Sequence, residues 1–203
     1  MKLSLLMIFV LLSPAALLPA EKSPPTYQIP LPPKPDFSSL EWMVGDWTGA
    51  TLKESRPANI QLSVSMDLGQ RIMVFKEVIS FAATKNAPAA KESSIGILSA
   101  SPGDGSYQLD SYSSTGFITR YRVTISGTEV DFNPAGGDQP PPGWLSRLAI
   151  THTDETAFTE TVQLAPPKRS FFDYYTAKFT KDLTKGPPPA SKETSKESKP
   201  STP

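Results

Sequence analysis

Residues 40–49 read LEWMVGDWTG, a short apolar lead-in followed by a Gly-x-Trp step that consists of Gly45, Asp46 and Trp47. We expect a helical turn over the lead-in and the first strand of a β-domain at the Gly-x-Trp step. Two tryptophans and one glycine lie within six residues here, and large aromatic rings are major contributors to a protein core. Trp42, Gly45 and Trp47 are therefore expected to set the geometry with which the chain enters a barrel.

The chain between residues 36 and 182 alternates strand-like runs with turn residues, at spacings typical of an all-β sandwich or barrel. Residues 60–66 and 117–125 alternate apolar with polar side chains, the period of a half-buried strand. Residues 71–81 are apolar on both faces, as in a strand that is long, bent by a bulge or covered on both sides. Further strand-like runs lie at residues 94–100, 106–112, 128–132, 144–151, 157–164 and 170–180.

Mostly tight turns join these runs, so an antiparallel up-and-down barrel of about eight to ten strands is favoured over a Greek-key sandwich. Residues 82–91, which are rich in Ala and Lys, and residues 133–143, with the sequence NPAGGDQPPPG, are the two longer connections. Proline and glycine exclude the second of these from a central strand. We expect both connections to lie near the mouth of the barrel.

The two ends of the chain differ from this body. Residues 1–20 have the charged, apolar and small-residue order of a secretory signal peptide, with cleavage expected after Ala15 or Ala20. Pro14 and Pro19 disfavour the alternative of an uncleaved anchor helix, so no transmembrane span is expected in the mature chain. Residues 21–36 form a Pro-rich linker, and residues 183–203 a Lys/Ser/Glu/Pro-rich tail that we expect to be disordered. The expected location is secreted or periplasmic.

Composition excludes several classes of site. The chain has no cysteine, which removes disulfides, thiol catalysis, iron–sulfur clusters and Cys-ligated zinc. Its 20 basic and 20 acidic residues balance, and no basic patch interleaved with aromatics appears, which argues against a nucleic-acid partner. A Gly-x-Ser-x-Gly elbow and a phosphate-binding P-loop are also missing from the sequence.

A helical turn followed by Gly-x-Trp at the first strand resembles the opening of the calycin superfamily, which includes the lipocalins. The phrase LEWMVGDWTG is similar to the start of bacterial secreted lipocalin-like domains of unknown function, which are related to the nitrobindin-type barrels. The resemblance covers residues 37–181 in strand pattern, and residues 40–49 carry its specific part. It implies a calycin-like barrel domain over residues 37–182.

The resemblance also implies roles for individual residues. In calycins the tryptophan closes one end of the barrel, and a basic residue of the last strand packs across its ring. Lys178, or alternatively Lys181, matches that position, where family members usually have arginine. Trp42, Gly45, Trp47 and Lys178 are therefore expected to close the barrel.

The function that the resemblance implies is the binding of a small hydrophobic or amphipathic ligand inside the barrel. The strand parity assigns the following residues to the inner, ligand-contacting face: Ile60, Leu62, Val64, Phe117, Tyr121 and Val123. We expect no catalytic residue, no metal ion and no cofactor. A packed barrel that serves as a structural or interaction module of the cell envelope is the alternative.

Haem is a further alternative, since nitrobindin-type barrels bind iron through a histidine. His152 is the only histidine, and it follows Trp144, Ser146, Leu148 and Ile150 on one strand parity, so it could face the interior. It lies at a strand end next to a turn, however, where a histidine is more often solvated or a capping group. One histidine without cysteine is also too few for a zinc site.

Other charged groups are expected to be ordinary surface residues. The carboxylate groups Asp104 with Asp110, and Asp154 and Glu155 with Glu160, are assigned to turns and hairpin tips. Arg120, Arg122 and Asp110 are expected to face outward, because their strand neighbours on the opposite parity are apolar. The alternative, in which they line the lumen and bind an anionic head group, stays open at this point.

Overall fold

The structure is a computed structural model that describes residues 30–53, 55–137 and 143–184. The chain divides into two units, residues 1–31 and residues 32–203, and the β-domain belongs to the second. The signal segment, the first part of the Pro-rich linker and nearly all of the C-terminal tail lie outside the described residues. Within those residues, no helix has the length and apolarity needed to cross a bilayer.

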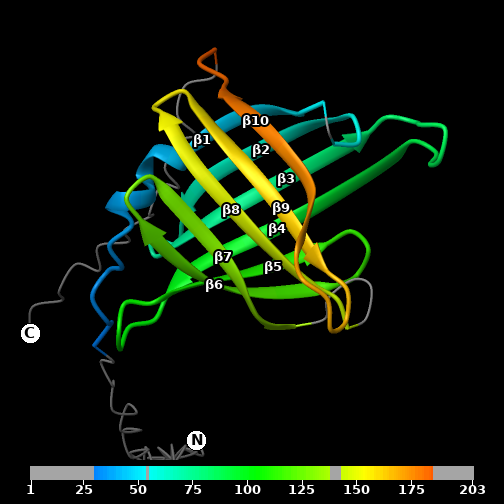
Figure 1. The fold of residues 1–203 in the computed structure, drawn as a ribbon. Coiled ribbons are helices and arrows are strands. Elements are labelled where there is room, and N and C mark those ends of the chain that lie inside the picture. The colour runs from blue at the N-terminus through cyan, green and yellow to red at the C-terminus, as the bar shows by residue number, and fades with distance from the viewer. Residues whose placement is uncertain (1–29, 54, 138–142, 185–203) are drawn as a thin grey trace, which may run out of the picture. The chain divides into compact units, whose positions relative to one another are not determined.

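Ten antiparallel strands form a closed barrel, preceded by one turn of 3-10 helix (Figure 1). In chain order the elements are η1 (Ser38–Met43), β1 (Gly45–Thr51), β2 (Ala58–Asp67), β3 (Ile72–Phe81), β4 (Ala90–Ala100), β5 (Tyr107–Ser113), β6 (Ile118–Ser126), β7 (Glu129–Gly137), β8 (Leu145–Asp154), β9 (Ala157–Ala165) and β10 (Phe172–Lys181). Each strand pairs with its neighbour in sequence, and β10 pairs with β1 to close the barrel. The predicted fold class, an up-and-down barrel with an N-terminal helical turn, is confirmed.

Two strands are longer than the sequence pattern indicates. β4 begins at Ala90, inside the expected loop, because Ala90–Ser93 continue the ladder with the full length of β3. β7 continues to Gly137, past the expected end at Phe132, with a register shift between Arg120 and Tyr121 of β6. Both strands continue because their backbone pairs with a long neighbouring strand, although apolar and polar side chains no longer alternate there. β3 itself pairs regularly on both sides, without the bulge considered for it.

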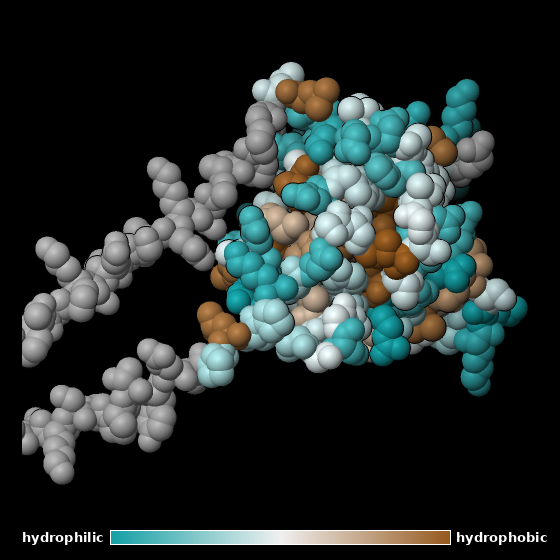
Figure 2. Space-filling model, turned by 90° about the vertical axis from the view of Figure 1, so that its left-hand side faces the viewer, coloured by the Kyte–Doolittle hydropathy of each residue, from teal (hydrophilic) through white to brown (hydrophobic). Residues whose placement is uncertain are grey.

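η1 and the start of β1 close one end of the barrel. Trp47 is only 1% exposed, and its Nε1 donates a hydrogen bond of 2.8 Å to the carbonyl oxygen of Met43 at the end of η1. Its ring meets the ring of Phe158 edge-on, with centroids 4.8 Å apart. Figure 2 shows the side of the molecule on which η1 lies. On this surface polar side chains surround smaller apolar areas. The expected role of Trp47 at the closed end matches this geometry.

The basic residue against Trp47 is Lys181, which corrects the assignment to Lys178. The Nζ of Lys181 lies 5.0 Å from the centroid of the Trp47 ring and donates a 3.1 Å hydrogen bond to the carbonyl oxygen of Trp42. Lys178 is exposed and pairs across the sheet with Ala50. Strand parity is the reason: Ala177 and Phe179 on either side of Lys178 are buried, whereas Lys181 has the inward parity.

Gly45 is required by this closure. Its φ of +139° is rarely adopted by residues with a side chain, and a Cβ at this position would lie 2.7 Å from Cε of Lys181. The glycine of the Gly-x-Trp step therefore leaves room for the lysine that covers the tryptophan two residues later.

We expect Lys181→Ala to lower the free energy of unfolding by about 1–3 kcal/mol, because it removes both the cation–π contact with Trp47 and the hydrogen bond to Trp42. Lys178→Ala is the matched control and should change stability by less than about 0.5 kcal/mol, since Lys178 is a surface residue. Urea unfolding of the two variants checks both values. Equal effects of the two substitutions would contradict the assignment.

Candidate ligand-binding cavity

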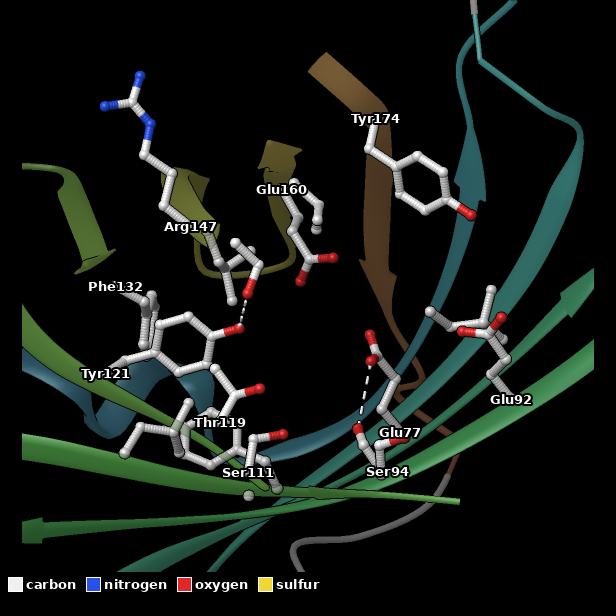
Figure 3. Close-up of a pocket in the computed structure, with 18 of the residues that line it drawn as sticks. Glu77, Glu92, Ser94, Ser111, Thr119, Tyr121, Phe132, Arg147, Glu160 and Tyr174 are labelled. Atoms are coloured by element: carbon white, nitrogen blue, oxygen red, sulfur yellow. Dashed lines mark hydrogen bonds between the residues drawn. The ribbon is translucent and has the colours of Figure 1, made fainter. Parts of the chain in front are cut away.

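A cavity of about 670 Å³ lies inside the barrel and is bordered by residues of every strand from β2 to β10 (Figure 3). Many of its lining residues lie at the strand ends remote from Trp47, among them Phe81 at the end of β3 and Ser113 at the end of β5. The connections at residues 82–89, 114–117 and 166–171 lie at the same strand ends, opposite η1. The loop segments expected at the mouth of the barrel are therefore at the cavity end, apart from residues 138–142, which lie outside the described residues.

Apolar side chains form a large part of the cavity wall. Phe75, Ile79 and Phe81 project from β3, Phe132 from β7 and Val162 from β9. These side chains offer a surface against which an apolar molecule gains free energy by leaving water. The remaining wall is polar, so the cavity suits a molecule with both kinds of surface.

Two carboxyl groups face this space from the barrel interior, Glu77 of β3 and Glu160 of β9 (Figure 3). Glu160 is 4% exposed, and its Oε1 accepts a 2.9 Å hydrogen bond from the hydroxyl of Tyr175, which is itself 5% exposed. Glu77 accepts a longer hydrogen bond of 3.5 Å from the hydroxyl of Ser94 on β4. Hydroxyl groups thus hold one oxygen of each carboxyl in place.

Burial makes both carboxyl groups weaker acids. Burial, together with the proximity of Glu160, raises the pKa of Glu77 to about 8. For Glu160, burial outweighs the hydrogen bond from Tyr175 and raises the pKa to about 7. Glu77 borders the cavity and keeps some accessible area, although the barrel encloses it. At neutral pH Glu77 is therefore largely protonated and Glu160 partly so when the cavity is empty.

Arg147 of β8 borders the cavity but does not neutralise these carboxyl groups. Its guanidinium lies 4.5 Å from the centroid of the Phe171 ring, and its Nε donates to the side-chain oxygen of Gln163. In Figure 3 its end points away from Glu77 and Glu160. In the part of the chain that the structure describes, neither carboxyl group forms a salt bridge.

The residues predicted to contact a ligand divide into two groups. Leu62, Phe117 and Tyr121 border the cavity, and the hydroxyl of Tyr121 lies 2.8 Å from that of Ser146. The other three are buried in the apolar core of the barrel and do not border the cavity: Ile60, Val64 and Val123. Strand parity thus identifies inward-facing residues, whereas contact with the cavity also depends on how the interior is packed.

The sequence interpretation missed the buried acids. It assigned Glu160 to a hairpin tip and did not single out Glu77 or Tyr175. A signal was present: Glu77 lies between Phe75 and Ile79 on one parity, and Glu160 lies between Phe158 and Val162. An acidic residue flanked at i−2 and i+2 by large apolar residues has the parity of the core.

Apart from Glu160, the charged residues discussed from the sequence lie outside the cavity. Arg120 and Asp110 form an exposed salt bridge of 2.8 Å, and Arg122 is exposed. Asp104 and Asp154 accept hydrogen bonds from the turn residues two positions later. These groups are not part of the cavity, and of the carboxylates considered from the sequence only Glu160 is.

His152 does not fit the role of a haem ligand. Its ring stacks on Trp42 at the closed end, with centroids 4.1 Å apart and an interplanar angle of 15°, and it does not border the cavity. Its Nε2 is buried without a hydrogen-bond partner among the described residues. The described residues also contain no group of three or more His, Asp or Glu side chains placed to hold a metal ion.

Comparison with known proteins supports the fold. No family model matches the chain, and no curated protein sequence matches it. Among solved structures it is similar to the crystal structure of Rv2717c from M. tuberculosis, with a TM-score of 0.51 and 14% sequence identity. The match covers 72% of this chain and 96% of that chain. At this identity the likeness shows the fold alone, a closed antiparallel β-barrel.

We expect the free energy of unfolding to fall as the pH rises from about 5 to 8, by on the order of 5 kcal/mol. The carboxyl groups of Glu77 and Glu160 ionise near the ordinary value of 4.5 in the unfolded chain but have raised pKa values in the folded barrel. Their contribution is therefore complete below about pH 4.5 and is lost as the pH passes through the folded pKa values.

Denaturant unfolding at several pH values checks this expectation. The double variant with Glu77→Gln and Glu160→Gln should lose most of the slope, because glutamine does not titrate. If the free energy of unfolding of the double variant changes with pH as steeply as that of the wild type, other groups cause the dependence.

Proposed function

We propose that this chain is a non-catalytic binding protein that holds a small amphipathic molecule inside its barrel. The observation that carries the proposal is the cavity of about 670 Å³ between the strands. Ligand sites in proteins typically occupy about 300–1,000 Å³ and combine apolar walls with a few fixed polar groups. This cavity has both features.

A packed barrel acting only as a scaffold is less well supported. Such a module would have a lumen filled by side chains, as small barrels often do. Here side chains fill the closed end around Trp47, while the opposite half keeps an open volume bordered by Phe75, Phe132 and Leu164. The contrast between the two halves is the arrangement expected of a carrier.

The proposed place of action is outside the cytoplasm, in the secreted or periplasmic space. This part rests on the signal-like order of residues 1–20, which lie outside the described residues. Expression of the full chain in a bacterial host should give a periplasmic product whose first residue is Ala16 or Glu21. N-terminal sequencing of that product, together with cell fractionation, checks the proposal, and a cytoplasmic product that keeps Met1 would contradict it.

We expect Ser111→Trp to weaken the binding of N-phenyl-1-naphthylamine, a probe that is uncharged at neutral pH, by at least about tenfold. Ser111 borders the cavity from β5, and an indole at this position would occupy part of the volume that the probe needs. Fluorescence titration of the purified mature protein measures the affinity.

Ser80→Trp is the matched control, because Ser80 is exposed on the outer face of β3. The control should bind the probe like the wild type. Circular dichroism shows whether each variant keeps its β-structure. Equal binding by a folded Ser111→Trp variant would place the probe outside the cavity, and no binding by the wild type would remove the support for a carrier.

A further inference from the structure

The polar part of the cavity wall consists of hydroxyl groups and of charged groups, among which acids outnumber bases. Three glutamates border it, Glu77 from β3, Glu92 from β4 and Glu160 from β9. Among the described residues that line the cavity, Arg147 is the single basic one, and its guanidinium is engaged with Phe171 and Gln163. A ligand that enters this space therefore meets hydrogen-bond acceptors without a cation beside them.

One oxygen of Glu160 is left for a ligand. The side chain is 4% exposed, and its Oε1 accepts the hydrogen bond from Tyr175. Its Oε2 has no hydrogen bond within the described part of the chain, and the carboxyl group points into the cavity (Figure 3). Since no donor of the described residues reaches this oxygen and the protein does not enclose it, a hydrogen-bond donor on a ligand can approach it from the cavity.

We propose that the ligand is a small organic cation, in which an apolar body carries a protonated amine that donates hydrogen bonds to Glu77 and Glu160. The inference rests on the function proposed above and specifies the class of ligand. The apolar body would lie against Phe75, Phe132 and Val162, which border the same cavity. An ammonium group has three donors and no acceptor, which complements acidic oxygens arranged on two walls.

Binding of the amine is expected to release protons, because the pKa values of the two acids are raised in the empty barrel. In the empty barrel Glu77 is largely protonated and Glu160 partly protonated near neutral pH. The ammonium group favours the ionised carboxylates, so these groups release protons to the solvent as the amine binds, and charge is conserved. The affinity for the amine should therefore rise with pH between about 6 and 9, while the amine itself stays protonated.

Other titratable groups face the same space and belong to the pH dependence. Burial raises the pKa values of the tyrosine hydroxyls above their ordinary value, so these groups stay neutral in this range. The titratable groups that line the cavity together with Glu77 and Glu160 are Glu92 of β4, Tyr121 of β6, Arg147 of β8, and Tyr174 and Tyr175 of β10, and the guanidinium of Arg147 points away from the two acids.

A carboxylate ligand is the competing class. A protonated glutamate can donate a hydrogen bond to an anion, and the affinity would then fall as the pH rises and the glutamates ionise. The acidic surroundings disfavour this class, because a third carboxyl group and no free guanidinium border the cavity. The opposite pH trends of the two classes separate them.

Calorimetric titration of the mature protein with octylamine, octanol and octanoic acid tests the proposal. The three probes share one chain length and differ in the head group. We expect octylamine to bind about tenfold to a hundredfold more tightly than octanol at pH 8, the range of a charge-assisted hydrogen bond. Titrations in buffers of different ionisation enthalpy should show net proton release with octylamine.

Glu77→Gln and Glu160→Gln keep the shape and polarity of the side chains but remove the charge. Each should reduce the affinity for octylamine about tenfold while leaving octanol unchanged. Both variants should fold, because glutamine resembles the protonated carboxyl group present in the empty barrel. Glu129→Gln is the matched control, since Glu129 is exposed at the start of β7.

The outcomes separate this inference from the proposed function. Equal binding of octylamine and octanol, with no effect of either glutamine variant, would overturn the cation proposal and leave the carrier function intact. Tightest binding of octanoic acid, weakening as the pH rises, would overturn it in favour of an anion. Failure of the octyl probes and of N-phenyl-1-naphthylamine to bind at all would overturn the carrier function itself.

Discussion

The closure of the sheet depends on the contact between Lys181 and Trp47. The two residues are direct partners in the ladder that joins the last strand to the first, and the lysine reaches the indole by passing over Gly45. The same ammonium group hydrogen-bonds the carbonyl oxygen of Trp42, so the turn before β1 is held by the end of β10. One end of the barrel is thereby filled with side chains, and the cavity opens toward the opposite end.

This division lets the barrel tolerate a polar interior. Enclosed carboxyl groups such as Glu77 and Glu160 cost free energy unless they are neutral or paired. The closed half offsets that cost with well-packed aromatic rings, among which Phe158 stacks on Phe179 at 4.5 Å and meets Trp47 edge-on. The packed aromatic core and the enclosed acids are therefore separated along the barrel axis, as expected if the acids bind the proposed ligand, because functional groups are seldom the most stable choice at their positions.

Much of the fold follows from the sequence, and less of the site does. Period-two alternation identifies β2 and β6 because their inward residues are apolar and their outward residues polar. The resemblance favours Lys178 as the residue that covers Trp47, whereas strand parity decides which lysine faces inward and selects Lys181. The sequence pattern assigns Glu160 to a hairpin tip, where acidic residues are usually exposed. The cavity itself could not be predicted, since Ile60 and Leu62 share one parity while only Leu62 borders the open volume.

The buried acids connect the stability of the barrel with its occupancy. Ionisation of Glu77 and Glu160 weakens the empty barrel, because each charge then lies in a medium that solvates it poorly. The same ionisation strengthens the attraction for a bound ammonium group. A ligand that binds only the folded state adds its binding free energy to the free energy of unfolding, and this addition grows with pH as the carboxylates form. If the proposed cation binds, the occupied barrel should therefore be less sensitive to rising pH than the empty barrel, because the cation would pair with the charges of these two side chains.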